Sequence, residues 1–246
     1  MLKGIDTAQN CQAVASQLAA KGIRVVARYY NVNDPGKNLT APEAQALSAA
    51  GLKIVAVWEN GFPTTPGYFS YHMGLTDATS ALAIAKKVGQ PNGAIYFAVD
   101  FDASAQDLEG VIRSYFVGVA KVFQQVGNPY AIGVYGSGLT CSTVERIFPG
   151  IRYAWMAMST GWAGYKAFTG WSILQLESQS IAGLSCDIDE CMNDCGAFTV
   201  AAPSQTAPSQ PPALTQAWSN LDLCLTDLDT AVARVKQAVA AVKGVV

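Results

Sequence analysis

Eight short apolar segments recur along the chain, and each is followed by a polar or glycine-rich stretch. Runs of this length and composition are typical of buried strands. Helix-like stretches at 9–21, 41–50, 77–88 and 104–126 separate the early ones. The eight candidate strands are 3–6, 24–30, 53–59, 94–100, 130–136, 153–158, 172–177 and 185–189.

Alternation of strands and helices predicts a parallel α/β fold. Eight strands of this kind predict an irregular (β/α)8 barrel of the TIM type, with short or poorly formed helices in its second half. The competing arrangement is an open doubly wound sheet. It lacks support, because no glycine-rich phosphate-binding motif follows any of the strands.

The composition excludes some classes of function. Half of the residues are hydrophobic, only 14% are charged and the net charge is −2. The sequence has no cluster of basic residues, so it gives no indication of nucleic-acid binding. The start, Met-Leu-Lys-Gly-Ile-Asp, lacks the apolar core of a signal peptide, and no apolar run of roughly 18 residues predicts a transmembrane segment. We expect neither a cofactor nor a metal.

Six cysteines raise two possibilities. Cys186, Cys191 and Cys195 lie close together among acidic residues, with Cys11, Cys141 and Cys224 elsewhere. A zinc site lacks paired C-x-x-C spacing, and the single histidine, His72, is remote in sequence. One or two disulfides in this segment fit the spacing better than a zinc site does. They would indicate that the protein functions outside a reducing cytosol.

The ends of the candidate strands are rich in carboxylates. In a parallel barrel, these ends gather at one rim, where the active sites of such barrels lie. The sequence therefore predicts an acidic cleft. The polar residues that end strands are Asp6, Glu59, Asp100, Asp102, Gln175, Glu177, Asp187 and Asp189.

The fourth strand ends in two carboxylates, Asp100 and Asp102. They would share one face of the strand with Tyr96 and Ala98 if the strand continued through residue 102. Like charges held close raise the pKa of at least one group, and paired carboxylates are the equipment for cleaving a glycosidic bond. A helix N-cap is an equal alternative for Asp102, but it does not explain Asp100.

Aromatic residues would wall this cleft and stack on sugar rings. Trp58 and Tyr135 stand at strand ends and are the better candidates, whereas core packing is favoured for Trp155. The aromatic set is Tyr29, Tyr30, Trp58, Tyr135, Trp155 and Trp162.

The chain divides into three parts: a barrel over 1–200, a Pro/Ser/Gln linker over 201–212 and a patterned helix over 213–246. Apolar residues of the third part follow each other at alternating intervals of four and three, which is typical of a coiled-coil seam. We expect self-association or a helical partner. The alternative is a separate long helix docked on the barrel. The stripe is Leu214, Trp218, Leu221, Leu225, Leu228, Val232, Val235, Val239 and Val242.

Several motifs in order identify a family resemblance. They are G-I-D-T at 4–7, R-Y-Y at 28–30, I-Y-F-A-V-D-F-D at 95–102, G-V-Y-G at 133–136 and D-I-D at 187–189. With G-x-x-D-A at 74–78 and Q-L-E at 175–177, the chain resembles the glycoside-hydrolase-like domain of unknown function 1906 over roughly residues 3–200. That family is related to glycoside hydrolase family 25, the muramidase lysozymes.

The resemblance implies a glycosidase that acts on a peptidoglycan-like polysaccharide. Asp102 matches the catalytic Glu of the lysozymes and would be the general acid, although its side chain is one methylene shorter. Asp100 would stabilise the oxocarbenium-like charge or orient an N-acetyl group. Asp6 and Asp187 would hold substrate hydroxyls. Further contacts to substrate would come from Glu59, Trp58, Tyr30, Tyr135, Gln175 and Glu177.

Other functions remain open from sequence. Glu59 and Glu177 are alternative acids if Asp102 is only a cap. The domain could instead be a non-catalytic glycan-binding module on an oligomerising helix, or a toxin or lysin that targets the cell wall. In each case we expect action at the cell wall or outside the cytosol, reached by lysis or by export without a cleavable signal peptide.

Overall fold

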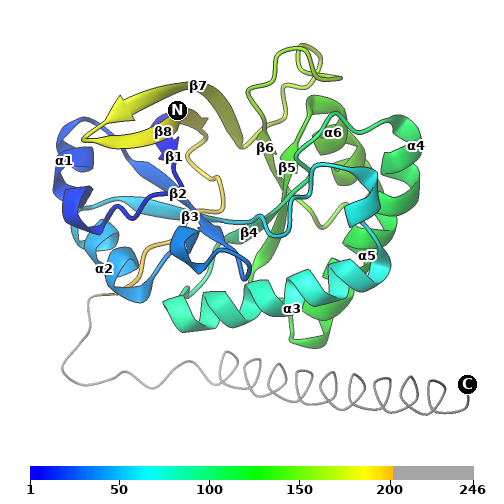
Figure 1. Ribbon diagram of the computed structural model, residues 1–246, viewed down its shortest axis with the longest axis horizontal. Helices are drawn as coiled ribbons and strands as arrows, with labels where there is room; N and C mark the ends of the chain where they lie inside the picture. Colours follow the sequence, from blue (N-terminus) through cyan, green and yellow to red (C-terminus); the bar gives the residue numbers. More distant parts are fainter. Residues whose placement is uncertain (202–246) are drawn as a thin grey trace, which may run out of the picture.

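The computed structural model describes residues 1–201, and these form one closed barrel (Figure 1). The strands follow each other around the barrel in sequence order, and β8 closes it against β1. The strands are β1 (Leu2–Asp6), β2 (Val25–Tyr30), β3 (Lys53–Trp58), β4 (Ala94–Ala98), β5 (Ala131–Gly136), β6 (Tyr153–Met156), β7 (Ile173–Ile181) and β8 (Leu184–Cys191).

The expected (β/α)8 barrel was wrong in its last quarter. Strands β1 to β7 pair in parallel, but β8 is antiparallel to both of its neighbours, so the barrel is mixed. Only the five connections between β1 and β6 carry α-helix within residues 1–201. The expected linker over 201–212 and the helix over 213–246 lie outside the described residues, apart from Ala201.

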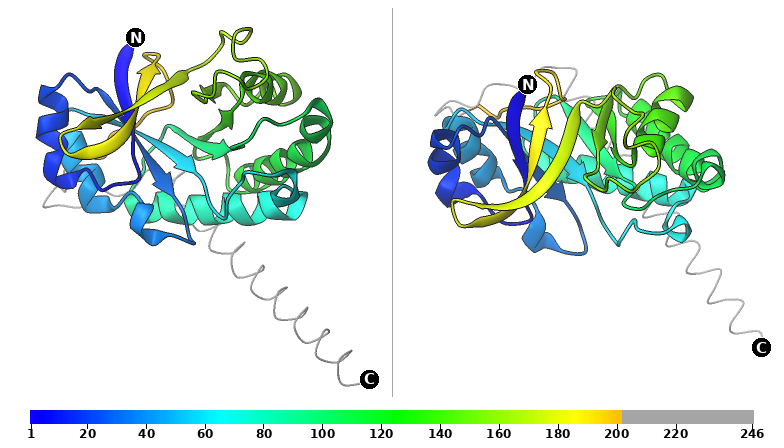
Figure 2. Two further views of the ribbon diagram at one scale, coloured as in Figure 1. Left: turned by 45° about the horizontal axis from the view of Figure 1, so that its top comes forward. Right: turned by 90° about the horizontal axis from the view of Figure 1, so that it is seen from above.

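A tight turn explains the reversal of the last strand. Ala182 and Gly183 join β7 to β8 and have positive φ angles of 53° and 82°. Two successive residues in this region make the turn that joins antiparallel strands, and two residues cannot carry a helical crossover. The resulting hairpin extends β7 beyond the barrel rim, as Figure 2 shows for the yellow strands.

Helices cover the barrel between its first six strands. The 41–50 stretch forms a helix as expected, and the 77–88 helix begins earlier, at Tyr71. The 104–126 stretch contains a π-helical turn, η4 (Leu108–Ile112). The α-helices are α1 (Ala15–Ala20), α2 (Ala41–Ala49), α3 (Tyr71–Val88), α4 (Ala105–Asp107), α5 (Arg113–Gln125) and α6 (Gly138–Ile147); single 3-10 turns are η1 (Gln12–Val14), η2 (Pro35–Lys37) and η3 (Pro66–Tyr68).

The core has two layers because successive strand residues face opposite sides of the barrel wall. In β4, Tyr96 and Ala98 pack inside the barrel, whereas Ile95 and Phe97 pack outward among the residues that contact the helices. This alternation decides which residues of each strand can reach the interior of the mouth.

Outside the barrel wall, one contact holds a helix on the wall and another packs two helices together. Arg28 of β2 and Glu43 of α2 form a fully buried ion pair, with Nε 2.7 Å from Oε1. Helices α3 and α5 approach so closely that a Cβ on Gly74 would lie 2.1 Å from the Tyr115 carbonyl oxygen. No helix within residues 1–201 has both the length and the hydropathy to cross a membrane.

Candidate active site at the barrel mouth

Polar side chains gather on the inner face of the barrel where the parallel strands end. β8 contributes although it runs the other way, because Asp187 pairs with Asp6 at the same level. Because side chains alternate between the two faces of each strand and its extension, a defined set of them points inward. This set is Asp6, Tyr29, Glu59, Asp100, Tyr135, Gln175 and Asp187. Six of these seven are catalytic or substrate-binding candidates from the sequence and Tyr29 is one of the expected aromatic walls, so the mouth brings together most of the expected cleft.

Gln175 is the centre of the hydrogen-bond network. Its Nε2 donates to Asp6 Oδ2 at 2.9 Å and to Asp187 Oδ2 at 3.3 Å, and its Oε1 accepts from the Tyr135 hydroxyl at 3.0 Å. The Tyr29 hydroxyl donates to Asp6 Oδ1 at 3.2 Å. Asp6 is thus held from two sides, and the amide orients two carboxylates toward each other.

The fold opposes ionisation of Asp6. The residue is 3% exposed, and burial is the main cause that raises the pKa of its carboxyl from 3.8 to about 7. The carboxylates of Asp187 and Glu59 raise the pKa further, while the hydrogen bonds from Gln175 and Tyr29 lower it. Near neutral pH this group therefore exchanges a proton readily, which suits acid–base chemistry.

Glu59 and Asp100 form the more open part of the mouth. Burial raises the pKa of both carboxyls, and the Asp100 charge raises the pKa of Glu59 further. Lys37 acts in the opposite direction on Glu59, with Nζ 3.8 Å from Oε1. Two partly exposed carboxyls, of which the charge on Asp100 opposes ionisation of Glu59, are the arrangement expected of an acid paired with a carboxylate.

A second layer lies deeper in the barrel. Asp189 is 1% exposed and accepts a hydrogen bond from Trp155 Nε1 at 3.1 Å. Burial and the nearby Asp6 raise the pKa of Asp189 well above its usual value. The Trp155 ring also packs edge-on against Tyr135, with ring centroids 5.3 Å apart. Trp155 therefore forms the bottom of the mouth.

Two hollows open at this end of the barrel and share Asp6 and Tyr29. One is lined by Asp6, Tyr29, Val57, Glu59, Tyr135, Trp155 and Gln175. The other is lined by Asp6, Thr7, Ala8, Tyr29, Ser185, Cys186 and Asp187. A larger groove of about 840 Å³ lies near the opposite end, between α5 and α6, but Lys121 is its only charged residue among the described ones. The acid cluster therefore favours the mouth as the site.

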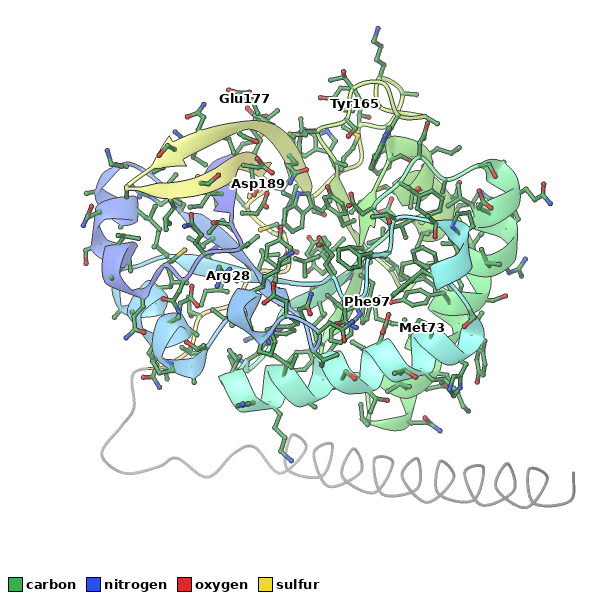
Figure 3. The ribbon with its side chains drawn as sticks, viewed as in Figure 1. Arg28, Met73, Phe97, Tyr165, Glu177 and Asp189 are labelled. Carbon is green, nitrogen blue, oxygen red and sulfur yellow. The ribbon has the colours of Figure 1, made fainter. Side chains whose placement is uncertain are left out.

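Four of the expected site residues do not reach the mouth. Tyr30 and Trp58 lie on the outer face of the wall, 0% and 2% exposed, and the Tyr30 hydroxyl donates to Gln90. Glu177 is exposed on the β7–β8 hairpin, where Figure 3 shows it at the outer edge. Asp102 is also exposed, and its Oδ1 accepts the Ala163 N–H at 2.8 Å.

The position of Asp102 follows from the end of β4. The strand ends at Ala98, and the Asp100 N–H donates to the Pro63 carbonyl instead of continuing the sheet. The inward alternation is lost beyond that point. Asp102 then anchors the connection between β6 and β7, which carries no helix.

The sequence interpretation missed the roles of three residues. Tyr29 was considered only as an aromatic wall, Trp155 as core, and Asp189 only as a strand end. Strict alternation could have identified Tyr29, because it lies two residues after Ala27 on the inner face. Within residues 1–201, no group of three His, Cys, Asp or Glu side chains is arranged to hold a metal ion.

Comparison with known proteins identifies the family. Residues 16–191 match the model of the Rv2525c-like, glycoside hydrolase-like domain. The chain therefore belongs to this family, in agreement with its motifs.

Particular relatives include two Bacillus subtilis proteins. The uncharacterized protein FadG is 29% identical over 76% of this chain, and the uncharacterized protein YbfG is 31% identical over 81%. The chain spans only 34% and 30% of these two proteins. They are about three times as long as the matched region.

Solved structures share the fold. The Tat-secreted Mycobacterium tuberculosis protein Rv2525c, in complex with L-tartrate, superposes with a TM-score of 0.67 at 21% identity, over 80% of this chain and 97% of that one. The modular autolysin LytC of Streptococcus pneumoniae, in complex with a synthetic peptidoglycan ligand, has a TM-score of 0.53 at 13% identity, over 76% and 46% of the two chains. A family 25 glycosyl hydrolase from Bacillus anthracis has a TM-score of 0.50 at 11% identity, over 80% and 88%.

Proposed function

We propose that the domain hydrolyses a peptidoglycan-like polysaccharide by carboxylate acid catalysis at the barrel mouth. The observation that carries the proposal is the cluster of Asp6, Glu59, Asp100 and Asp187 on one inner rim. Three of these carboxyls have raised pKa values. Glycosidic bond cleavage needs a protonated carboxylic acid beside an ionised carboxylate, and a cluster of carboxyls that resist ionisation favours such a mixed state.

Glu59 and Asp100 take the two reacting roles in this proposal. Both are partly exposed, and the Asp100 charge favours the protonated form of Glu59. Glu59 would donate the proton to the leaving oxygen, and Asp100 would stabilise the oxocarbenium-like charge or orient a reacting N-acetyl group. Asp6, Asp187 and Gln175 would bind sugar hydroxyls, since their polar atoms already form one network.

Asp102 becomes a positioning residue in this scheme. Its contact with the Ala163 N–H links the end of β4 to the β6–β7 connection beside the mouth. Loss of that contact would displace the connection rather than remove the acid. A displacement of about 1 Å can cost on the order of 10²-fold in rate, so Asp102 can matter without reacting.

The comparisons support the class of substrate and the place of action. The LytC structure contains a synthetic peptidoglycan ligand, and the Rv2525c protein is described as Tat-secreted. We extend both features to this chain as part of the proposal: the substrate is a cell-wall glycan, and the protein acts outside the cytosol. Association with another protein chain is expected only through the segment 213–246.

The test is release of reducing ends from purified cell wall. Wild type is compared with Glu59→Gln, Asp100→Asn and Asp102→Asn, and exposed Glu177→Gln is the matched control. We expect losses on the order of 10² to 10⁴-fold for the first two variants, a smaller loss for the third and none for the control. Equal turnover by wild type and the Glu59 and Asp100 variants would overturn the proposed pair.

A glycan-binding module is the second candidate. The observation that favours it is Asp102, which stands where the resembled family 25 lysozymes carry their catalytic Glu. It predicts that the protein binds insoluble cell wall without releasing reducing ends, and that binding survives Glu59→Gln. Retention of wall-bound protein in a sedimentation assay, with no soluble product, would favour this candidate over hydrolysis.

A further inference from the structure

The barrel is closed at the end opposite the mouth by the segment 192–198. The Ala94 N–H donates to the Gly196 carbonyl at 2.8 Å, and Phe198 exchanges two backbone hydrogen bonds with Ile54. A Cβ on Gly93 would lie 2.5 Å from the same Gly196 carbonyl oxygen. This segment, the barrel floor, therefore passes tightly under the starts of β3 and β4.

Two cysteines stand where β8 passes into this floor. Cys191 is the last residue of β8, and Cys195 follows after three residues; they are 0% and 1% exposed. Both belong to the inner core with Tyr96 and Trp155, and the Tyr96 hydroxyl donates to the Cys195 carbonyl at 2.8 Å. The backbone hydrogen bonds of β8 and of the barrel floor thus confine the two thiols to the same part of the inner core.

The two thiols influence each other's ionisation. The Cys191 thiol is the main cause that lowers the pKa of Cys195. Lys53, at the start of β3, also lowers this pKa. The pKa of Cys191 is raised first by Cys195 and then by burial. One thiol thus ionises more readily than usual beside a second thiol in the same inner core, as in dithiols that oxidise together.

For the other described cysteines, burial and not a second thiol is the main cause of the pKa shift. The sulfur atoms of Cys11, Cys141 and Cys186 each donate to backbone carbonyls, at distances of 3.4 to 3.8 Å. Burial raises the pKa of Cys11 to about 12 and that of Cys141 further. They serve as internal controls, because they share burial with the pair but not its geometry.

We propose that Cys191 and Cys195 are oxidised to an intramolecular disulfide that fastens the barrel floor to β8. The Cys195 thiolate attacks one sulfur of a disulfide oxidant, either a small molecule or an oxidoreductase, and expels one thiolate. Cys191 then loses its proton, attacks Cys195 Sγ and expels the second thiolate. The protein loses two thiol protons and two electrons, and the oxidant becomes two thiols.

Burial determines when the reaction occurs. With both thiols enclosed, the oxidant reaches Cys195 during folding or after the floor has opened locally. Oxidation in a refolding reaction is therefore faster than oxidation of the folded protein. The disulfide forms at the end of the barrel opposite the mouth, so its main effect is on stability.

The experiment maps the disulfide in the full chain after refolding with oxidised glutathione. Free thiols are alkylated, and the protein is cut on the N-terminal side of aspartate without reduction. Cleavage before Asp187, Asp189 and Asp194 leaves Cys186, Cys191 and Cys195 in three different peptides. We expect the second and third peptides to be joined, with a mass lower by two hydrogens than their sum, while the Cys186 peptide is alkylated.

Thermal unfolding gives the second measurement. Oxidised protein should melt above reduced protein, and this difference should vanish in Cys195→Ser but persist in the matched variant Cys141→Ser. Alkylation of both Cys191 and Cys195 after refolding, or a bond from either to another cysteine, would overturn the proposal. If Cys195→Ser fails to fold, the peptide map of the wild type decides alone.

Discussion

Replacing Asp6 by Asn should make the stability of the domain less dependent on pH. Asp6 is held inside the mouth by Tyr29 and Gln175, and burial raises the pKa of its carboxyl from 3.8 to about 7. The folded state therefore retains a proton that the unfolded chain releases. Asn keeps the shape of the side chain but cannot ionise.

The sign and size follow from that pKa. Below about pH 4, Asp6 is protonated in both states, and its ionisation does not affect stability. Between pH 4 and 7 only the unfolded state ionises, so the wild type loses stability as the pH rises. Raising the pKa from 3.8 to about 7 corresponds to roughly 4 kcal/mol at 1.36 kcal/mol per pH unit. Above pH 7 the loss is complete.

The assay is urea unfolding followed by tryptophan fluorescence between pH 4 and 8. The free energy of unfolding of Asp6→Asn, relative to wild type, should rise by about 4 kcal/mol across this range. The change with pH is the observable, because Asn also weakens one of the two hydrogen bonds. Exposed Glu177→Gln should follow the wild type. A constant difference between Asp6→Asn and wild type at every pH would refute the raised pKa.

Three further predictions use the same unfolding assay. Glu43→Gln leaves the buried Arg28 guanidinium without its charge partner and should cost roughly 3–5 kcal/mol; a cost near zero would contradict the ion pair's role. Gly74→Ala should cost about 1–3 kcal/mol by forcing α3 from α5, whereas Gly110→Ala, which meets no atom within 4 Å, should not destabilise. Gln175→Leu should cost about 1–3 kcal/mol at neutral pH and extend the pH-dependent loss of stability to higher pH, because the Asp6 pKa in the folded state would rise further; an unchanged pH profile would exclude the effect of the Gln175 hydrogen bond on Asp6.

The positions of the strands could be predicted from the sequence, but the direction of the last one could not. Apolar periodicity reports burial and not strand direction, so 185–189 was expected to run parallel to the others. The seven residues between 177 and 185 are too few for a helical crossover. Ala182-Gly183 instead forms the turn, and the remaining residues extend both strands into a hairpin.

The site could be predicted where the chain stays in the sheet. Asp6, Glu59 and Gln175 continue the inward-facing alternation of their strands. They also stand at the predicted strand ends, so the sequence predicts them as site residues. Trp58 was included because it ends a strand, although its neighbour Glu59 occupies the inward position. Glu177 would share the face of Gln175 in a regular strand, but a bulge between Gln175 and Ser178 shifts the register.

The reversal of β8 determines which of its two aspartates meets the solvent. In a parallel strand, Asp189 would lie nearer the rim and Asp187 deeper. Because β8 runs from the rim to the floor, Asp187 pairs with Asp6 at the rim and is half-buried, while Asp189 pairs with Gly4 below it. Figure 3 shows Asp189 within the barrel.

The buried acid is tolerated because the surroundings favour its neutral form. Burial together with Asp6 raises the pKa of Asp189 well above its usual value, and the hydrogen bond from the Trp155 N–H only partly offsets this effect. Because burial disfavours a charge on Asp189, repulsion beneath Asp6 is reduced. The hairpin turn reverses β8 and thereby places Asp187 at the rim and Asp189 deeper in the barrel. The two aspartates of one motif therefore have different environments at the mouth.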